Sequence, residues 1–324
     1  MNFFAAQSKA ARYTGRWDIT ETAAITTAPG GMIEIGLQGK MAIMHFDIKT
    51  NQHPYPHLWV KVDDGAKIEV PLDRYLRVET ETDGNHVITV IFKGAVEMQH
   101  RWYPPLIGKV SFCGFEAEQE GALPDDYRKT IEFIGDSITE GVLVDEDYKA
   151  DSSDQPNRVY QDDVTATYAY KTAQALNLKP IIMGYGATGI TCGGQGAVPK
   201  VSEGYPFYYH NVPIENNKAD YIVINHGTND GQATAEEYIS GMEEFLKLVR
   251  KRNPLSKIAV MTPFYGSFRD EILCFIPEFN KKYNESVLVI DTKGWLPKLP
   301  VHPGREGHMR AAGKLTEILK EWIS

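Results

Sequence analysis

Residues 131–141 read Ile-Glu-Phe-Ile-Gly-Asp-Ser-Ile-Thr-Glu-Gly, and this stretch decides the fold class. An apolar, strand-like run ends in Gly135, and Ser137 follows two residues later. An α/β protein presents a nucleophile in this way at the carboxyl edge of a parallel sheet, where such folds bind ligands. A lone Gly-Asp-Ser is more typical of a turn with a helix-capping serine. Three later segments make it informative, namely Gly186 within Gly-Ala-Thr-Gly, Gly-Thr-Asn-Asp at 227–230, and His302 followed by proline.

The composition is that of a folded, acidic chain. Its 324 residues suggest about two domains. With 42% hydrophobic and 24% charged residues, a sizeable core is possible. The net charge of −9 argues against nucleic acid or an anionic membrane as a partner. The three cysteines match no zinc spacing, no run approaches the ~18 apolar residues of a membrane span, and the N-terminus has no leader pattern. We therefore expect a cytoplasmic protein.

Up to about residue 122 the pattern is that of an all-β domain. Strands are expected at residues 32–35, 41–46, 58–62, 67–70 and 87–92. The third and fourth flank Asp-Asp-Gly at 63–65, as in a β-hairpin. Many short strands with regular turn signals predict a sandwich. Because residues 119–130 are polar and contain Gly and Pro, we place the domains at 1–124 and 125–324.

From residue 131 onward, strands alternate with helices. Strands are expected at residues 131–134, 181–183, 221–225, 258–262 and 287–290, and helices near 165–177, 235–251, 269–283 and 305–322. The second helix opens with a capping-box pattern, Thr234 with Glu237. This order predicts an α/β domain, with a parallel sheet covered by helices on both faces.

Three of the segments carry residues that suit nucleophilic catalysis. A serine hydroxyl is a poor nucleophile at neutral pH, so it needs a base within hydrogen-bond reach and donors for the oxyanion that forms on the substrate. Ser137 is the candidate nucleophile. The amide of Asn229 and the backbone N–H of Gly186 both follow strand ends and are candidate donors. The alternative is that these are ordinary turns, because Gly, Asn and Asp are common turn residues.

His302 is the candidate base, because the pKa of an imidazole lies near neutral pH. It directly precedes the last expected helix. Most histidines are structural or on the surface, and this chain has nine. Of the rivals, His308 lies inside that helix, from which a strand-end serine is harder to reach, and we expect His226 to be structural.

Residues 184–189, Gly-Tyr-Gly-Ala-Thr-Gly, also match the dinucleotide fingerprint Gly-x-Gly-x-x-Gly. That function requires a helix immediately afterwards and an acidic residue about 20 positions further on. The sequence continues instead with residues 190–199, Ile-Thr-Cys-Gly-Gly-Gln-Gly-Ala-Val-Pro, which cannot begin a long helix. Nucleotide binding is therefore the weaker alternative.

Together, the four ordered segments resemble the blocks of the SGNH (GDSL-type) hydrolases over about residues 130–322. The resemblance implies a three-layer, flavodoxin-like domain with Ser137 as nucleophile and His302 as base. It also implies an oxyanion hole formed by the N–H groups of Ser137 and Gly186 and the amide of Asn229, without a metal or an organic cofactor. The Gly-x-Ser-x-Gly elbow of the α/β-hydrolases does not occur around Ser137.

One position departs from the family pattern. SGNH hydrolases usually have an aspartate three residues before the histidine, and here that position is Leu299. Asp291, the nearest preceding acid, closes a strand. Loss of the orienting carboxylate in other serine hydrolases costs about 10⁴ in rate. Either a backbone carbonyl or a distant carboxylate orients the imidazole, or the enzyme is slow.

The N-terminal part resembles the β-domain of the two-domain carbohydrate esterases of family 2. The similarity lies in Tyr-Thr-Gly-Arg-Trp at 13–17, Pro-Gly-Gly at 29–31, Gly39 and Val-Lys-Val-Asp-Asp-Gly at 60–65. It implies a jelly-roll-like sandwich in front of the hydrolase domain. It also implies hydrolysis of acetyl esters on sugars such as xylo- or gluco-oligosaccharides, here a small imported oligosaccharide or glycoside.

Several residues are candidates for lining a sugar-binding cleft. Aromatic faces stack on sugar rings, although most aromatic residues are core. Trp295 and Tyr208 are the best candidates, and Asp136 adjoins the nucleophile. The acidic segment 145–163 is expected to form a wall of the cleft or a solvated loop. Two other functions stay open at this point, a thioesterase or lysophospholipase and a catalytically weakened carbohydrate-binding protein.

Overall fold

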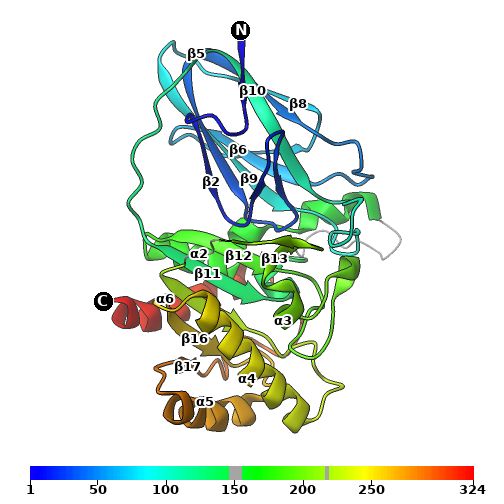
Figure 1. Cartoon of the computed structure of the whole chain (residues 1–324), viewed down its shortest axis with the longest axis vertical. Helices are drawn as coiled ribbons and strands as arrows, with labels where there is room; N and C mark the ends of the chain where they lie inside the picture. Colours follow the sequence, from blue (N-terminus) through cyan, green and yellow to red (C-terminus); the bar gives the residue numbers. More distant parts are fainter. Residues whose placement is uncertain (146–154, 216–218) are drawn as a thin grey trace.

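Two sheets organise the chain, one antiparallel and one parallel (Figure 1). The computed structural model describes residues 1–145, 155–215 and 219–324. The ten-stranded sheet comprises β1 (Asn2–Ala5), β2 (Ala11–Thr14), β3 (Asp18–Ile19), β4 (Ala24–Thr26), β5 (Met32–Phe46), β6 (His57–Val62), β7 (Ile68–Pro71), β8 (Tyr75–Glu79), β9 (Asn85–Gly94) and β10 (Val110–Glu120). Within the described ranges, no helix has both the length and the apolar character needed to cross a membrane.

The long strand β5 lies in the middle of the N-terminal sheet, between β10 and β9. The two runs expected at 32–35 and 41–46 are one strand of 15 residues. Gly39, with φ of +129°, lies between them, and β5 changes partner there from β9 to β8. A glycine adopts this backbone conformation without the steric cost of a side chain, so the strand can bend and continue. The expected hairpin is confirmed, since β6 and β7 pair antiparallel.

The second sheet contains five parallel strands, β11 (Thr130–Gly135), β12 (Lys179–Gly184), β15 (Tyr221–Asn225), β16 (Lys257–Met261) and β17 (Leu288–Ile290). Their order, β12-β11-β15-β16-β17, is the order expected for a flavodoxin-like sheet. Both faces are covered, which explains the unbroken apolar runs in the sequence. Along β11, Ile131 and Phe133 pack into one layer of the core and Ile134 into the other.

Helices form the outer layers. They are α1 (Ser137–Glu140), α2 (Tyr168–Ala175), α3 (Val201–Gly204), α4 (Ala235–Arg252), α5 (Arg269–Tyr283) and α6 (Arg305–Ile323), with short 3₁₀ turns at Gln155–Gln161, Val164–Ala166 and Gln195–Ala197. Residues of α2 and α6 pack on one face of the sheet, and residues of α4 and α5 on the other. The capping box at Thr234 is confirmed. The helix expected at 165–177 begins only at Tyr168, because Thr167 caps it and ends the preceding turn. A small antiparallel pair, β13 (Phe207–Tyr209) and β14 (Val212–Pro213), completes the elements.

The register of the central strands brings the sequence motifs to one level. Gly135 pairs with Gly184 on one side and with Asn225 on the other. Parallel strands have their carboxyl ends at the same edge of a sheet. The three motif-bearing loops therefore leave this edge side by side.

Two buried ion pairs join the two sheet regions. Arg101, in the loop after β9, lies 2.6 Å from Glu140 of α1, and the side chains are 0% and 2% exposed. Arg16 and Glu132 form the other pair, 3.0 Å apart. The described chain forms neither helix nor strand from 121 to 129. We propose the boundary between domains 1–124 and 125–324 within this segment.

Replacing Arg101 with Met is expected to lower the free energy of unfolding by about 3–5 kcal/mol, because it leaves the Glu140 carboxylate buried without its cation. The double variant Arg101→Met/Glu140→Leu should recover much of that loss. The exposed pair Arg77–Glu79, with side chains 63% and 62% exposed, offers the control, and Arg77→Met should change stability little. Guanidinium denaturation followed by tryptophan fluorescence measures all three. Equal effects of Arg101→Met and Arg77→Met would contradict the expectation.

Candidate active site

Ser137 lies at the tight turn between β11 and α1. The carboxylate of Asp136 caps α1 by accepting a hydrogen bond from the N–H of Ile138 at 3.0 Å. The turn needs glycine at position 135, since a Cβ there would lie 2.1 Å from the Thr139 hydroxyl. Ser137 is 7% exposed, so it is largely buried at this edge of the sheet.

The Ser137 hydroxyl and the His302 imidazole meet, although 165 residues separate them in sequence. Oγ of Ser137 lies 2.9 Å from Nε2 of His302. His302 belongs to the loop between β17 and α6, which returns to the same edge of the sheet. A hydrogen bond of this length is what transfer of the hydroxyl proton to an imidazole requires.

The surroundings of His302 keep its ring neutral. Burial lowers its pKa to about 4, and the nearby Arg158 guanidinium contributes in the same direction. No hydrogen bond to the other ring nitrogen, Nδ1, is found in the described ranges. Leu299, at the usual aspartate position, is 75% exposed. Asp291 instead accepts a hydrogen bond from Arg269 at 2.8 Å.

Asn229 lies on the loop that follows β15. Its side-chain amide donates one hydrogen bond to the carbonyl of Thr188 at 3.0 Å. An amide nitrogen has two N–H groups, so one donor is left for a substrate oxygen. Asp230, which the sequence analysis did not single out, accepts from the backbone N–H groups of Ile190 at 3.1 Å and Thr191 at 2.7 Å. It thereby ties the Gly186 loop to the Asn229 loop.

Gly186 is packed under a residue of the N-terminal sheet region. A Cβ at this position would lie 2.1 Å from Oε2 and 3.0 Å from Cβ of Glu97, so the Glu97 side chain would have to move to accept one. Burial raises the pKa of the Glu140 carboxyl, and the backbone N–H of Gly186 acts in the opposite direction. The first element after Gly189 is the short turn Gln195–Ala197, so the long helix that dinucleotide binding requires does not follow.

The structure corrects two of the expected lining residues. Trp295 is 6% exposed and packs in the core beside Phe264, because its indole faces the α2–α6 layer rather than the solvent. Asp136 is fully buried, and this burial raises its pKa to about 7. Tyr208 lies half-buried on β13, with Arg16 and Asp18 as charged neighbours. Residues 146–154 of the acidic segment 145–163 lie outside the described residues, whereas Asp145 and residues 155–163 are described.

The rival histidines are both buried. His308 on α6 accepts a hydrogen bond from the N–H of Tyr168 at 3.1 Å through Nδ1. His226 lies beside Asp230, and burial lowers its pKa to about 4. Neither contacts Ser137 through a hydrogen bond in the part of the chain that the structure describes.

A groove of about 380 Å³ lies next to the His302 loop. The prolines at 300 and 303 and Tyr265 border it, and Arg305 and Arg310 of α6 contribute charge. Asp145 and Glu306 add negative charge to its lining, and Val144 and Leu296 add apolar surface.

Comparisons with known proteins indicate the family and the fold. The profile of the GDSL-like lipase/acylhydrolase family matches residues 133–310. The chain is 26% identical over 222 residues to the cellulase/esterase CelE of Acetivibrio thermocellus. The aligned region covers 62% of this chain and 25% of that protein. The chain thus spans about a quarter of the length of this curated relative.

Solved structures share the whole fold. A family two carbohydrate esterase from Cellvibrio japonicus has a TM-score of 0.81 at 18% identity, covering 100% of this chain and 99% of that one. An acetyl xylan esterase from the rumen bacterium Butyrivibrio proteoclasticus has a TM-score of 0.80 at 19% identity, with coverage of 100% and 99%. At these identities the likeness establishes the fold. Since the family profile matches more than half of the sequence, and the predicted SGNH motifs meet at one sheet edge, the chain belongs to the GDSL-like lipase/acylhydrolase family.

Proposed function

We propose that this chain is a serine esterase that removes O-acetyl groups from oligosaccharides or glycosides through an acyl-serine intermediate. The observation that carries the proposal is the 2.9 Å contact between Ser137 Oγ and His302 Nε2, at the edge where the Asn229 amide also lies. The carbohydrate part rests on the likeness to carbohydrate esterases along the whole chain. The proposed reaction uses neither a metal nor an organic cofactor.

The proposed mechanism has two half-reactions. Neutral His302 accepts the Ser137 proton through Nε2 while Oγ attacks the acetyl carbonyl carbon. The resulting oxyanion accepts hydrogen bonds from the second N–H of Asn229 and the backbone N–H of Ser137, with Gly186 as the third proposed donor. The imidazolium then donates its proton to the leaving sugar oxygen as the bond to the acyl carbon breaks. In the second half-reaction, His302 accepts a proton from water as the water oxygen attacks the acyl carbon. The bond between the acyl carbon and Ser137 Oγ then breaks, His302 returns the proton to Oγ, and acetate leaves.

We also infer two finer features. The N-terminal sheet is proposed to be a jelly-roll-like sandwich, because ten strands with a bend at Gly39 of β5 are better accommodated by a sheet that folds over its own core than by a flat one. A reducing, cytoplasmic location is supported by the three free cysteines.

Acetate release from a panel of acetylated oligosaccharides tests the proposed function. The wild type should release acetate, and Ser137→Ala should lose this activity by several orders of magnitude, because no nucleophile remains. Among p-nitrophenyl esters, kcat/KM should be highest for acetate and fall with chain length. A maximum at long chains would favour a lysophospholipase or thioesterase. Binding of sugar without acetate release, and without labelling by a serine-directed phosphonate, would favour a binding protein.

Asn229→Ala is expected to lower kcat by roughly 10²–10³ with a smaller change in KM, because the lost donor acts on the charge that develops in the transition state. Asn229→Asp, which keeps the shape but adds a negative charge next to the oxyanion, should be at least as slow. Steady-state kinetics on p-nitrophenyl acetate measure both. A loss in kcat of less than about threefold would remove Asn229 from the oxyanion hole.

The acid limb of the pH–rate profile should report His302. Only the neutral imidazole accepts a proton, and the pKa of His302 is lowered to about 4 by burial and Arg158. The value of kcat/KM should therefore stay high down to about pH 5 and fall as the pH drops through 4. Arg158→Met removes the cation, raises the pKa and moves the limb to higher pH. A wild-type limb near pH 6.5, or no shift in the variant, would contradict this assignment.

A further inference from the structure

The His302 loop lacks the side chain that orients the histidine in most SGNH hydrolases. Its position 299 is Leu, and the structure gives Nδ1 no hydrogen bond within the described ranges. Between β17 and α6 the loop has no regular secondary structure. The place of the imidazole must therefore be set by what holds the loop on either side.

Tyr265 holds the side of the loop before His302. Its hydroxyl lies 3.0 Å from the carbonyl oxygen of Pro300 and 2.7 Å from that of Val301, and it donates to this pair. These are the two residues directly before the histidine. Tyr265 itself follows β16, so this contact attaches the His302 loop to the end of a strand of the parallel sheet.

Arg305 holds the other side, three residues after His302, as the first residue of α6. Its guanidinium donates to Asp145 at 2.8 Å and to Asp163 at 3.1 Å through Nη2. A guanidinium presents its donors in a rigid, planar fork, so a pairing of this kind fixes orientation as well as distance.

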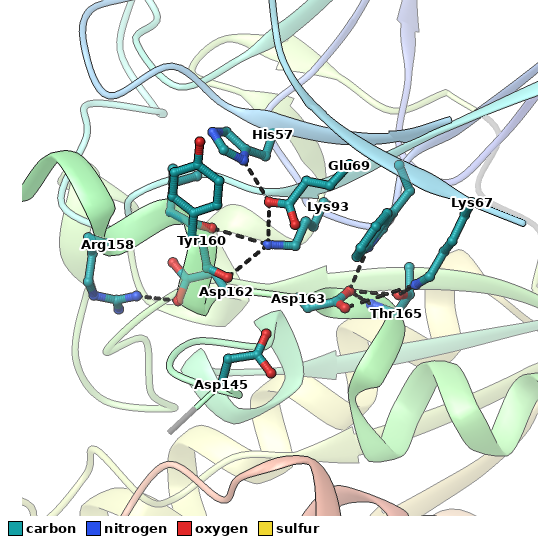
Figure 2. Close-up of polar contacts among 12 residues, drawn as sticks. His57, Lys67, Glu69, Lys93, Asp145, Arg158, Tyr160, Asp162, Asp163 and Thr165 are labelled. Carbon is teal, nitrogen blue, oxygen red and sulfur yellow. Dashed lines mark hydrogen bonds and ion pairs between the residues drawn. The ribbon is translucent and has the colours of Figure 1, made fainter. Parts of the chain in front are cut away.

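Asp163 is an unusual partner because its side chain is fully buried and accepts hydrogen bonds from three different side chains. Thr165 donates through its N–H at 2.9 Å and its hydroxyl at 2.6 Å, and the indole N–H of Trp59 donates at 3.0 Å. The Lys67 ammonium lies 4.0 Å away (Figure 2). Burial raises the pKa of this carboxyl, but Lys67, these donors and Arg305 outweigh it, so the pKa is lowered and the group stays charged.

Two of these partners belong to the N-terminal sheet region, Trp59 on β6 and Lys67 in the turn after it. A second set of contacts from the N-terminal sheet region holds the chain just before Asp163. Lys93 of β9 lies 2.8 Å from Glu69 and donates to the Tyr160 carbonyl at 3.0 Å (Figure 2). Residues 158–165 are thus attached to the N-terminal region at both ends.

We propose that Asp163 is a positioning residue for His302, acting through Arg305, and that Trp59 of the N-terminal region holds Asp163 in place. The inference rests on the proposed Ser137–His302 chemistry. It assigns the N-terminal region a part in catalysis that does not depend on sugar binding. A displacement of a catalytic group by ~1 Å can cost about 10²-fold in rate, so the support of the histidine should be visible in kinetics.

The test uses the full chain and two probes that do not need a sugar site. One is the rate at which a small fluorophosphonate labels Ser137, and the other is steady-state hydrolysis of p-nitrophenyl acetate. The variants are Asp163→Asn, Arg305→Met, the double variant of both, and Trp59→Phe, which removes the indole N–H and keeps an aromatic ring at that position. Glu285→Gln is the matched control, because it breaks another two-point ion pair with Arg250, with both contacts at 2.8 Å, away from the active-site edge.

Asp163→Asn should slow labelling and lower kcat by about 10-fold or more, with KM changed less than about threefold. Trp59→Phe should do the same to a smaller extent. If Asp163 acts through Arg305, the double variant should be no slower than the slower single variant, because either single change already removes the contact between Asp163 and Arg305. Glu285→Gln should stay within about twofold of the wild type in both assays.

Wild-type labelling in Asp163→Asn, or additive losses in the double variant, would overturn the inference. Should Asp163→Asn fail to fold, as judged by circular dichroism, Trp59→Phe carries the test, and wild-type kinetics in that variant would overturn the part assigned to the N-terminal region. If the wild type itself is not labelled, the proposed function falls, and the inference falls with it. If the wild type is labelled and only the acetylated sugars are not cleaved, the substrate proposal fails while the inference stands.

Discussion

The parallel register of β12, β11 and β15 is the constraint on which the site depends. Gly135 pairs with Gly184 and Asn225 in register. The loops that follow these three strands therefore begin side by side and can contact the same substrate. Backbone hydrogen bonds set this register, and apolar side chains buried on both faces preserve it. A slip of one residue would turn the side chains of a strand to the opposite layer and separate Ser137 from its neighbours.

The fourth member of the site comes from outside that register. His302 lies on a loop that no strand pairing holds, so its position depends on side-chain contacts at both ends. These contacts lead through Asp163 to Trp59, and thus into the N-terminal region. The buried pair of Arg101 and Glu140 joins the same two regions beneath the nucleophile. Contacts from the N-terminal region therefore reach both the helix that begins at Ser137 and the residues that hold the His302 loop.

Most of the regular elements could be predicted from the sequence, since each depends on a local pattern. The strand at Tyr221–Asn225 and the helix at Arg269–Tyr283 have the predicted bounds, because a short apolar run and a helical apolar period are properties of neighbouring residues. The prediction for Trp295 was wrong for the converse reason. An aromatic residue has the same sequence signature in a core as on a sugar-binding surface, and only packing distinguishes the two.

The sequence by itself determined the order of the main strands and helices from residue 131 onward, the strand-end placement of Ser137, Gly186 and Asn229, and the choice of His302 as their partner. The first two follow from local periodicity, turn chemistry and the rule that parallel strands share an edge, and the choice of His302 rests on the resemblance of the four ordered segments to the SGNH hydrolases. Only the tertiary structure decided that Asn229 donates to Thr188, that Glu97 covers Gly186, and that Asp163 links Trp59 to Arg305. Such contacts join segments up to 142 residues apart, and no local pattern encodes them, because they exist only once the core has packed and brought those segments together.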